Sequence, residues 1–357
     1  MNTTIPDDFV NSQIEAGIFT EEIVAPEITG LPRPITLLRA PRKNKPITFK
    51  WHGDGDTFCP PQWFDLGIGS GPCGLGCRAC FLTLTFRALR DPWRPVVYDN
   101  YSYFADAVKA WLKHPDRRPQ HTMGLGIDQA DSLLLEGVTG HARRLIPLFG
   151  DKNTNPAGCK LVLLTKTANV HYLAEVPENL RQNTVVSFSL NPEPICDLWE
   201  GKYPDTGERI SPSADKRLTA ALEAQLMGYP VRIRLDPILT PSSWENMYFD
   251  FIEQIWQTGI QFDYWTLGTY REKLNNAIAS WGHFWGMLPM EWELDHDTLV
   301  KDGTHWRASD DYRFGVYSTV RDTIRRFFPG SPIGLCKETH QMRKKLGLTN
   351  ACCNCLR

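Results

Sequence analysis

The sequence of 357 residues has no apolar run that approaches the ~18 residues needed to span a membrane. Its first 17 residues are polar and acidic, so they lack the apolar core of a secretory signal peptide. We therefore expect a cytoplasmic protein without a membrane partner, in which the ten cysteines stay reduced and available to bind metal. A hydrophobic content of 42% and a charged content of 22% are ordinary for a globular protein with one large domain and additions.

The densest cysteine cluster, Cys73-x3-Cys77-x2-Cys80, lacks the nearby second pair of cysteines or histidines that a zinc knuckle uses. Its odd number of thiols also fits poorly with a disulfide framework. Glycines between the three cysteines allow the backbone to curl, so the sulfur atoms can point at one centre. A 4Fe-4S cluster normally has four cysteine ligands, and three leave one iron open to a different ligand. The spacing therefore predicts a 4Fe-4S cluster with one open iron.

Strand and helix patterns alternate along the middle of the chain. The expected strands are residues 63–69, 122–127, 160–165, 184–190, 231–235 and 262–268. The expected helices between them are residues 101–112, 141–149, 214–227 and 244–258. Alternation of this kind predicts an α/β fold with a parallel sheet, which we interpret as a partial (β/α)6 TIM-like barrel, with a complete barrel as the alternative. The expected segments are an N-terminal lead-in that wraps the core (1–60), the barrel (61–271) and a C-terminal extension (272–357).

Polar side chains gather where the expected strands end. In barrels of this type the chemistry lies at the carboxyl ends of the strands. The residues at or just past those ends are the cysteine loop, Asp128, Lys166, Ser189, Asp236 and residues 269–271. Their convergence favours an active site on that face of the barrel.

The cysteine spacing resembles the signature of the radical S-adenosylmethionine (SAM) superfamily, and a longer stretch resembles its spore photoproduct lyase-like branch. This resemblance runs from about Leu66 to Arg271 and resumes near the C-terminus. It depends on the segments GLGIDQADSL (124–133), LTKTANV (164–170), SFSLN (187–191), GYP (228–230), DPI (236–238) and TLG (266–268). The resemblance implies an enzyme whose open iron holds SAM and which cleaves SAM reductively to give a 5′-deoxyadenosyl radical.

The resemblance also implies which residues bind SAM. Asp128 would accept hydrogen bonds from the SAM ammonium group, Lys166 would pair with its carboxylate and Ser189 would lie near the ribose. The structural alternatives are a helix N-cap for Asp128, a solvated strand end for Lys166 and a buried hydroxyl for Ser189. Asp236 shares one face of its strand with the arginines two and four residues before it. That row of charges predicts either cofactor binding by Asp236 or an internal ion pair.

The chain departs from the family pattern in the residues that transfer hydrogen. In the lyase that repairs thymine dimers of spores, a cysteine after the second strand donates hydrogen, and tyrosines help to return it. The matching position here falls at or near Asp128, and no cysteine lies between Cys80 and Cys159. The neighbours of Cys80 are Ala79 and Phe81, which carry no transferable hydroxyl hydrogen. We therefore predict that this protein does not perform that repair reaction.

Four further cysteines lie in the last 22 residues, namely Cys336, Cys352, Cys353 and Cys355. One interpretation is a second metal site, either an auxiliary Fe-S cluster or zinc, that ties the C-terminal segment to the barrel. The alternative is a buried Cys336 and a reactive C-terminal tail.

The charge is distributed unevenly, although the net charge is only −2. Residues 31–50 carry six Lys or Arg and no acid, and residues 312–357 carry nine against two acids. Solvated surface is one explanation of the charges, and core packing is the better explanation of most of the twelve tryptophans. The basic segments, the aromatic content and the family resemblance nevertheless favour a DNA or modified-nucleoside substrate.

These features together predict a radical SAM enzyme that receives electrons from an external donor. We expect it to abstract hydrogen from a nucleic-acid base, in the rearrangement or modification of a modified pyrimidine. One alternative is a radical SAM enzyme for a peptide or small metabolite, with the C-terminal cysteines holding an auxiliary cluster. The other is a non-catalytic Fe-S or zinc protein that binds nucleic acid.

Overall fold

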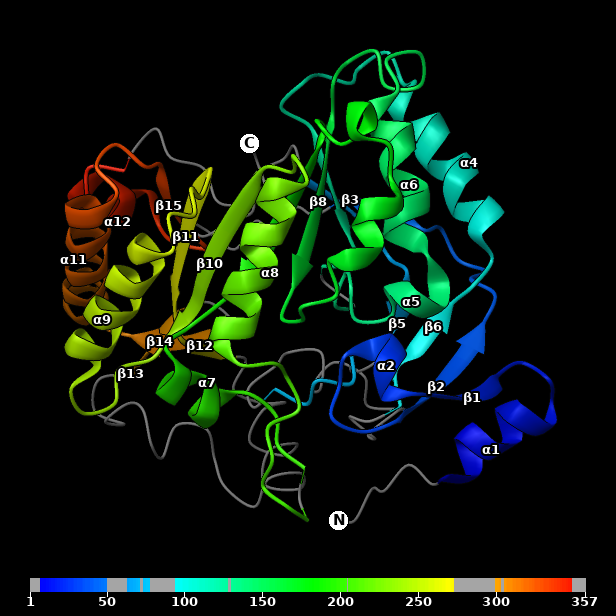
Figure 1. The fold of residues 1–357 in the computed structure, drawn as a ribbon, viewed down its shortest axis with the longest axis horizontal. Helices are drawn as coiled ribbons and strands as arrows, with labels where there is room; N and C mark the ends of the chain where they lie inside the picture. Colours follow the sequence, from blue (N-terminus) through cyan, green and yellow to red (C-terminus); the bar gives the residue numbers. More distant parts are fainter. Residues whose placement is uncertain are drawn as a thin grey trace.

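The computed structural model describes residues 7–49, 63–70, 73–77, 94–127, 130–203, 205–272, 299–302 and 305–348. Its largest sheet has eight strands in the order β15-β11-β10-β9-β8-β7-β4-β3. The six strands of the predicted repeat are β4 (Trp63–Leu66), β7 (Thr122–Leu125), β8 (Lys160–Thr165), β9 (Thr184–Ser189), β10 (Val231–Ile238) and β11 (Tyr264–Thr269). All neighbouring pairs among these six are parallel. The described sheet does not close, which confirms the α/β fold with an open parallel sheet (Figure 1).

Both edges of this sheet come from segments outside the repeat. β3 (Ile47–Phe49) pairs antiparallel with β4, and β15 (Ile333–Leu335) pairs in parallel with β11. Neither strand was expected from the sequence, because three residues are too few to show a periodic pattern. The lead-in and the C-terminal extension thus each contribute a strand to the barrel sheet, and the division into three segments stays a prediction.

Helices cover the sheet (Figure 1). Four of those within the repeat agree closely with the expected ranges, namely α4 (Tyr101–Leu112), α6 (His141–Gly150), α8 (Ala214–Leu226) and α9 (Trp244–Gln257). The short helix α7 (Glu193–Trp199) was not expected from the sequence. In α4, Phe104, Val108 and Trp111 are buried at helical spacing. α8 begins after Ser213, whose side chain accepts a hydrogen bond from the amide of Lys216 (3.2 Å). An apolar stripe in α4 and an N-cap in α8 are thus the local causes of these two helices.

A second, small sheet lies beside the cysteine loop. Its strands, in spatial order, are β1 (Thr20–Val24), β2 (Ile35–Ala40), β6 (Val96–Tyr98) and β5 (Gly69–Ser70). The short helices α1 (Asp7–Glu15), α2 (Pro26–Thr29) and α5 (Glu136–Thr139) complete this part of the chain, at the lower right of Figure 1. Since β5 directly precedes the cysteine loop, this sheet helps to fix where the loop begins.

The C-terminal extension packs at the β11 edge of the large sheet. It contains β13 (Leu299–Asp302), β14 (His305–Ala308), α11 (Asp310–Phe327) and α12 (His340–Lys345), and β14 also pairs with β12 (Arg271–Glu272). α11 contacts α9 and α12. Two 3-10 helices, η1 (His171–Glu175) and η2 (Glu178–Leu180), lie between β8 and β9.

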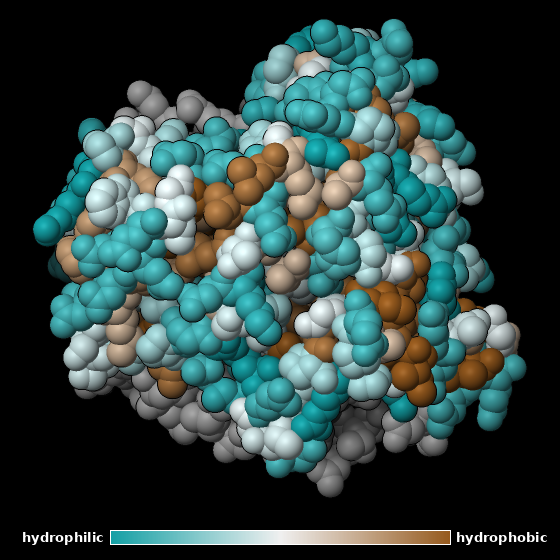
Figure 2. Space-filling view, viewed as in Figure 1, coloured by the Kyte–Doolittle hydropathy of each residue, from teal (hydrophilic) through white to brown (hydrophobic). Residues whose placement is uncertain are grey.

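The face of the molecule that Figure 2 draws is mostly polar. Figure 2 shows apolar side chains in small groups, one of them over α2 and β1, where Ile23 and Ile28 are exposed. In the part of the chain that the structure describes, no helix has both the length and the apolar character of a membrane-spanning segment.

Candidate active site at the cysteine loop

The cysteine loop follows β5, and its described part runs from Cys73 to Cys77. Gly74 and Gly76 have φ angles of 90° and 57°, a region that residues with side chains rarely adopt. The loop therefore turns sharply between the two cysteines. Leu75 is buried between these glycines, in one apolar cluster with residues of β1 and β2. The lead-in thus packs against the loop and supports it from one side.

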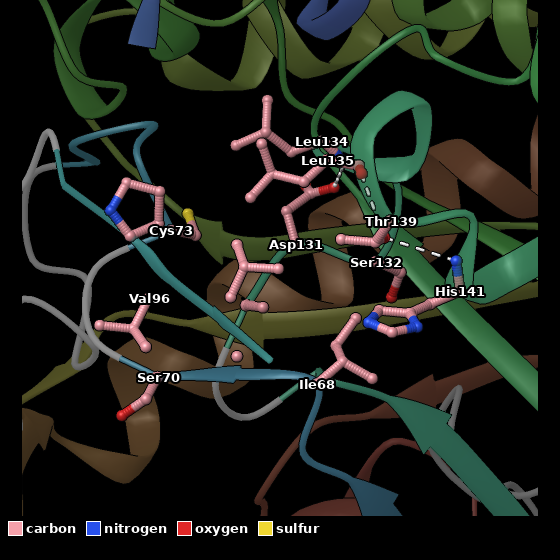
Figure 3. Close-up of a pocket in the computed structure, with 14 residues that line it drawn as sticks. Ile68, Ser70, Cys73, Val96, Asp131, Ser132, Leu134, Leu135, Thr139 and His141 are labelled. Carbon is pink, nitrogen blue, oxygen red and sulfur yellow. Dashed lines mark hydrogen bonds between the residues drawn. The ribbon is translucent and has the colours of Figure 1, made fainter. Parts of the chain in front are cut away.

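Cys73 lines a cavity of about 30 Å³ behind this loop. Figure 3 shows Cys73 and His141 on opposite sides of that cavity. The ring of His141 donates from Nε2 to the carbonyl oxygen of Tyr98 (2.7 Å), and burial lowers the pKa of His141 to about 4. His141 is therefore a neutral residue at pH 7 that anchors the start of α6 to β6.

Lys166 and Ser189 meet at the carboxyl ends of β8 and β9. The Lys166 ammonium donates to the Ser189 hydroxyl (Nζ–Oγ 2.9 Å) and lies 3.3 Å from Oε1 of Glu200. Because β8 and β9 are parallel neighbours, their ends are adjacent. The structure therefore brings together two of the residues that the sequence singled out.

Glu200 and Arg217 complete this group, and neither was predicted from the sequence. The side chains of Arg217 and Glu200 are 0% and 1% exposed, and the guanidinium donates twice to the carboxylate (2.8 and 2.7 Å). Arg217 also donates to the backbone oxygen of Ser189 (2.9 Å). Burial raises the pKa of Glu200, but the charges of Arg217 and Lys166 outweigh it and lower that pKa to about 2. Glu200 is therefore a permanent buried anion.

Cys77 lies within electrostatic reach of these cations. Burial lowers the pKa of Lys166, but the charges of Glu200 and then Cys77 outweigh it, so the net pKa is raised. Cys77 also contributes to the raised pKa of Arg217. Because the thiolate is the metal-binding form of cysteine, a lysine and an arginine nearby favour metal binding by Cys77.

Asp131 ties the loop after β7 to the end of β8. Its carboxylate accepts hydrogen bonds from the amide of Lys166 (2.7 Å), from the hydroxyl of Thr165 (2.8 Å) and from the amides of Leu133 and Leu134 (2.9 and 3.0 Å). Burial nevertheless raises the pKa of Asp131. This aspartate fixes the backbone from which the Lys166 side chain projects.

Asp236 lies at the end of β10 between two guanidinium groups. It accepts hydrogen bonds from Arg234 (Nη2–Oδ2 2.6 Å) and Arg271 (Nη1–Oδ1 3.1 Å). Burial opposes ionisation of Asp236, but Arg271 and Arg234 hold its pKa well below the usual range. The internal ion pair is therefore formed, and a cofactor-binding role for Asp236 stays a prediction.

Cys336 contacts the same two arginines. Its sulfur accepts hydrogen bonds from Arg234 (2.8 Å) and Arg271 (3.3 Å), and the residue is buried. Both hydrogen bonds already engage the lone pairs of this sulfur, so a metal site at Cys336 would require them to be broken.

Several predicted site residues lie outside the described residues, so their roles stay predictions. They are Cys80, Asp128, Cys352, Cys353 and Cys355. The described ranges contain no group of three or more His, Cys, Asp or Glu side chains placed to bind a metal ion. In the described part of the loop, two thiols on a glycine-shaped turn beside two cations fit the thiolate ligands of an Fe-S cluster, with Cys80 as the expected third.

Residues 50–263 match the family model of spore photoproduct lyase. The spore photoproduct lyase of Bacillus subtilis (strain 168) is 26% identical over 202 residues, which are 56% of this chain and 53% of that protein. The chain therefore matches about half the length of that curated relative.

Solved structures of spore photoproduct lyase variants have a similar fold. One variant, solved with dinucleoside spore photoproduct, has a TM-score of 0.65 at 18% identity, over 84% of this chain and 82% of the other. Another, solved with bound AdoMet and dinucleoside spore photoproduct, also has a TM-score of 0.65 at 18% identity, over 85% and 82% of the two chains.

The open parallel sheet, which these solved structures share, defines a protein of the partial-barrel class. Within that class, the chain belongs to the spore photoproduct lyase family. The family and the partial (β/α)6 barrel that the sequence predicted are therefore confirmed.

Proposed function

We propose that this protein is a radical SAM enzyme that holds a 4Fe-4S cluster through Cys73, Cys77 and Cys80. When bound, the cluster would supply the electron that cleaves SAM to a 5′-deoxyadenosyl radical, and an external donor would reduce the cluster. The observation that carries this proposal is the partly buried Lys166 ammonium, held by Ser189 and Glu200 and within electrostatic reach of Cys77, in a chain of the spore photoproduct lyase family.

The residues around the cysteine loop would bind and orient SAM. Lys166 would pair with its carboxylate, Ser189 would contact its ribose and Asp128 would accept from its ammonium group. The hydrogen bond between Lys166 and Ser189 supports the first two roles, because both groups lie close together at the carboxyl ends of β8 and β9. Asp236 is the weakest candidate, since two guanidinium groups already engage its carboxylate. The side chains of β9 and β11 are buried throughout, so this interior would exclude water.

The proposed substrate is a nucleic-acid base. A spore photoproduct lyase variant has been solved with dinucleoside spore photoproduct, which supports a nucleoside-type ligand in this family. In the present chain, the C-terminal extension exposes basic side chains on two helices in contact: Arg325 and Arg326 on α11, and Lys344 and Lys345 on α12. Exposed lysines and arginines of this kind pair with phosphates.

We further propose that the reaction differs from spore photoproduct repair. Support comes from the sequence, which has no cysteine between Cys80 and Cys159 and has Ala79 and Phe81 beside Cys80. The reaction would instead rearrange or modify a pyrimidine-type base.

The substrate class is the first part to be tested, and the difference from spore photoproduct repair is the second. The protein is incubated anaerobically with SAM, dithionite and either DNA, modified nucleosides or spore photoproduct, and the products are measured by mass spectrometry. We expect a changed nucleobase and no efficient reversal of spore photoproduct. Efficient reversal would overturn the second part. DNA binding that is absent or insensitive to salt, without any nucleobase product, would overturn the first.

A second candidate is a radical SAM enzyme for a peptide or small metabolite, and the C-terminal cysteines favour it. Such an enzyme would use them for an auxiliary cluster or zinc. The arginine contacts of Cys336 weigh against that site. Iron and zinc counts in the full chain and in a chain truncated before Asn350 distinguish the two candidates.

A further inference from the structure

Glu200 and Gly201 follow α7 directly, and neither belongs to the cysteine loop or to the proposed SAM contacts. The Glu200 side chain is buried, binds Arg217 and lies 3.3 Å from the Lys166 ammonium. Ser211 donates a further hydrogen bond to the same carboxylate. One buried anion thus connects the ends of two strands, because Arg217 also holds the backbone of Ser189.

Gly201 contacts the cysteine loop through its backbone. A β-carbon at this position would lie 2.2 Å from the carbonyl oxygen of Leu75 and 2.5 Å from that of Gly76. Contacts this short are not found in proteins, and the atoms involved are backbone rather than flexible side chain. Only glycine therefore allows the loop to approach this close, directly before Cys77.

We propose that Glu200 and Gly201 act together as a positioning joint for the cluster and SAM. Glu200 fixes the Lys166 ammonium and the local charge near Cys77, and Gly201 fixes the distance of the cysteine loop from that charge. Because the two residues are consecutive, the charge and the loop are set by the same short piece of backbone. This inference depends on the proposed function, since it assumes a cluster on the cysteine loop.

The Gly201 part is tested with Gly201→Ala and a matched control. Gly150, the last residue of α6, is the matched position, because a β-carbon there would also meet backbone, 2.1 Å from the carbonyl oxygen of Leu180. Gly150→Ala therefore introduces a clash of the same kind without touching the cysteine loop. Gly315→Ala, with open space around it, controls for the substitution itself. The readouts are iron per folded chain after anaerobic reconstitution and the melting temperature of the apo-protein.

We expect Gly201→Ala to lose at least half of its iron, while Gly150→Ala keeps wild-type iron per folded chain despite a lower melting temperature. Wild-type iron content in folded Gly201→Ala would overturn this part. If Gly201→Ala does not fold, the Glu200 variant alone decides the inference.

The Glu200 part is tested with Glu200→Gln, which keeps the shape of the side chain and removes its charge. Loss of a buried anion near Cys77 stabilises the more negative, reduced cluster, so its midpoint potential should rise. Glu193→Gln is the control, because its exposed carboxylate binds Arg209 at the outer end of the same network. A purely structural role of Glu200 would change cluster content but leave the potential of the retained cluster unchanged.

The outcomes separate this inference from the proposed function. A wild-type protein without iron on the cysteine loop contradicts the proposed function. A wild-type protein that binds the cluster, with a Glu200→Gln potential equal to wild type and iron retained in folded Gly201→Ala, contradicts only the positioning joint.

Discussion

Lys166 and Ser189, at the ends of neighbouring parallel strands, are joined by a hydrogen bond of 2.9 Å between ammonium and hydroxyl. This contact fixes a cationic group on the face of the barrel where the cysteine loop lies. The raised pKa of Lys166 keeps that group charged at neutral pH. Because the Lys166 side chain is already held in place, binding a carboxylate would cost little of its conformational entropy.

Replacing Lys166 should weaken SAM binding more than it weakens the fold. Charge-assisted hydrogen bonds contribute about 1.5–3 kcal/mol, so Lys166→Met should raise the Kd for SAM by about 10- to 100-fold. Lys160→Met, at the opposite end of the same strand, is the matched control. Calorimetry on the reconstituted proteins measures both values. Equal SAM affinity in wild type and Lys166→Met would show that Lys166 does not bind the carboxylate.

Breaking the buried ion pair at Arg217 should be costly. Arg217→Met leaves the Glu200 charge buried with fewer partners, so we expect the free energy of unfolding to fall by about 3–5 kcal/mol. Arg39, whose partners Glu22 and Asp99 are 39% and 37% exposed, is the comparison, and Arg39→Met should cost about 1 kcal/mol or less. Urea unfolding of the apo-proteins measures the two changes. Similar losses for both variants would contradict a structural role for the buried pair.

The β/α repeat could be predicted from the sequence because each element is long enough to show its own period. β8 and α4 have the expected bounds, residues 160–165 and 101–112. β15, with three residues, is too short for such a signal, although it adds a parallel strand to the barrel sheet. The small sheet beside the cysteine loop was also missed. Its strands are short, and the closely spaced prolines around them indicated an irregular segment.

The candidate site could be predicted only where a motif or a strand end marked it. Lys166 and Ser189 are such residues, and they do meet. Glu200 and Arg217 belong to no motif and follow no strand. Charged residues are usually exposed, and the pairing of positions 17 residues apart has no local sequence signal. Gly201 could not be found either, since its importance comes from a loop more than a hundred residues away in the chain.

The stability of the apo-protein should depend on the titration of His141. Its pKa is about 4 in the folded protein and about 6.5 when unfolded. The unfolded chain therefore binds the proton first as the pH falls, and stability should decrease between pH 6.5 and pH 4 by up to about 3 kcal/mol. His141→Gln keeps a donor for Tyr98 but does not titrate, so it should lose this part of the pH dependence. Unchanged pH dependence in His141→Gln would contradict the buried neutral state of His141.

Cys336 should be dispensable for metal binding. Two arginines already bind its sulfur, so Cys336→Ser should retain the metal content of wild type, about four irons per chain for one 4Fe-4S cluster. Cys77→Ser should lose that iron. Elemental analysis after anaerobic reconstitution compares the three proteins. A loss of zinc or additional iron in Cys336→Ser would instead support a second metal site.

We expect the cysteine loop to hold a cluster that enables reductive cleavage of SAM. The most direct measurement is the release of 5′-deoxyadenosine from SAM by the dithionite-reduced, reconstituted protein. We predict release by wild type and none by Cys73→Ala, Cys77→Ala or Cys80→Ala. No release from a wild-type protein with a complete 4Fe-4S cluster, or equal release from a cysteine variant, would contradict the claim.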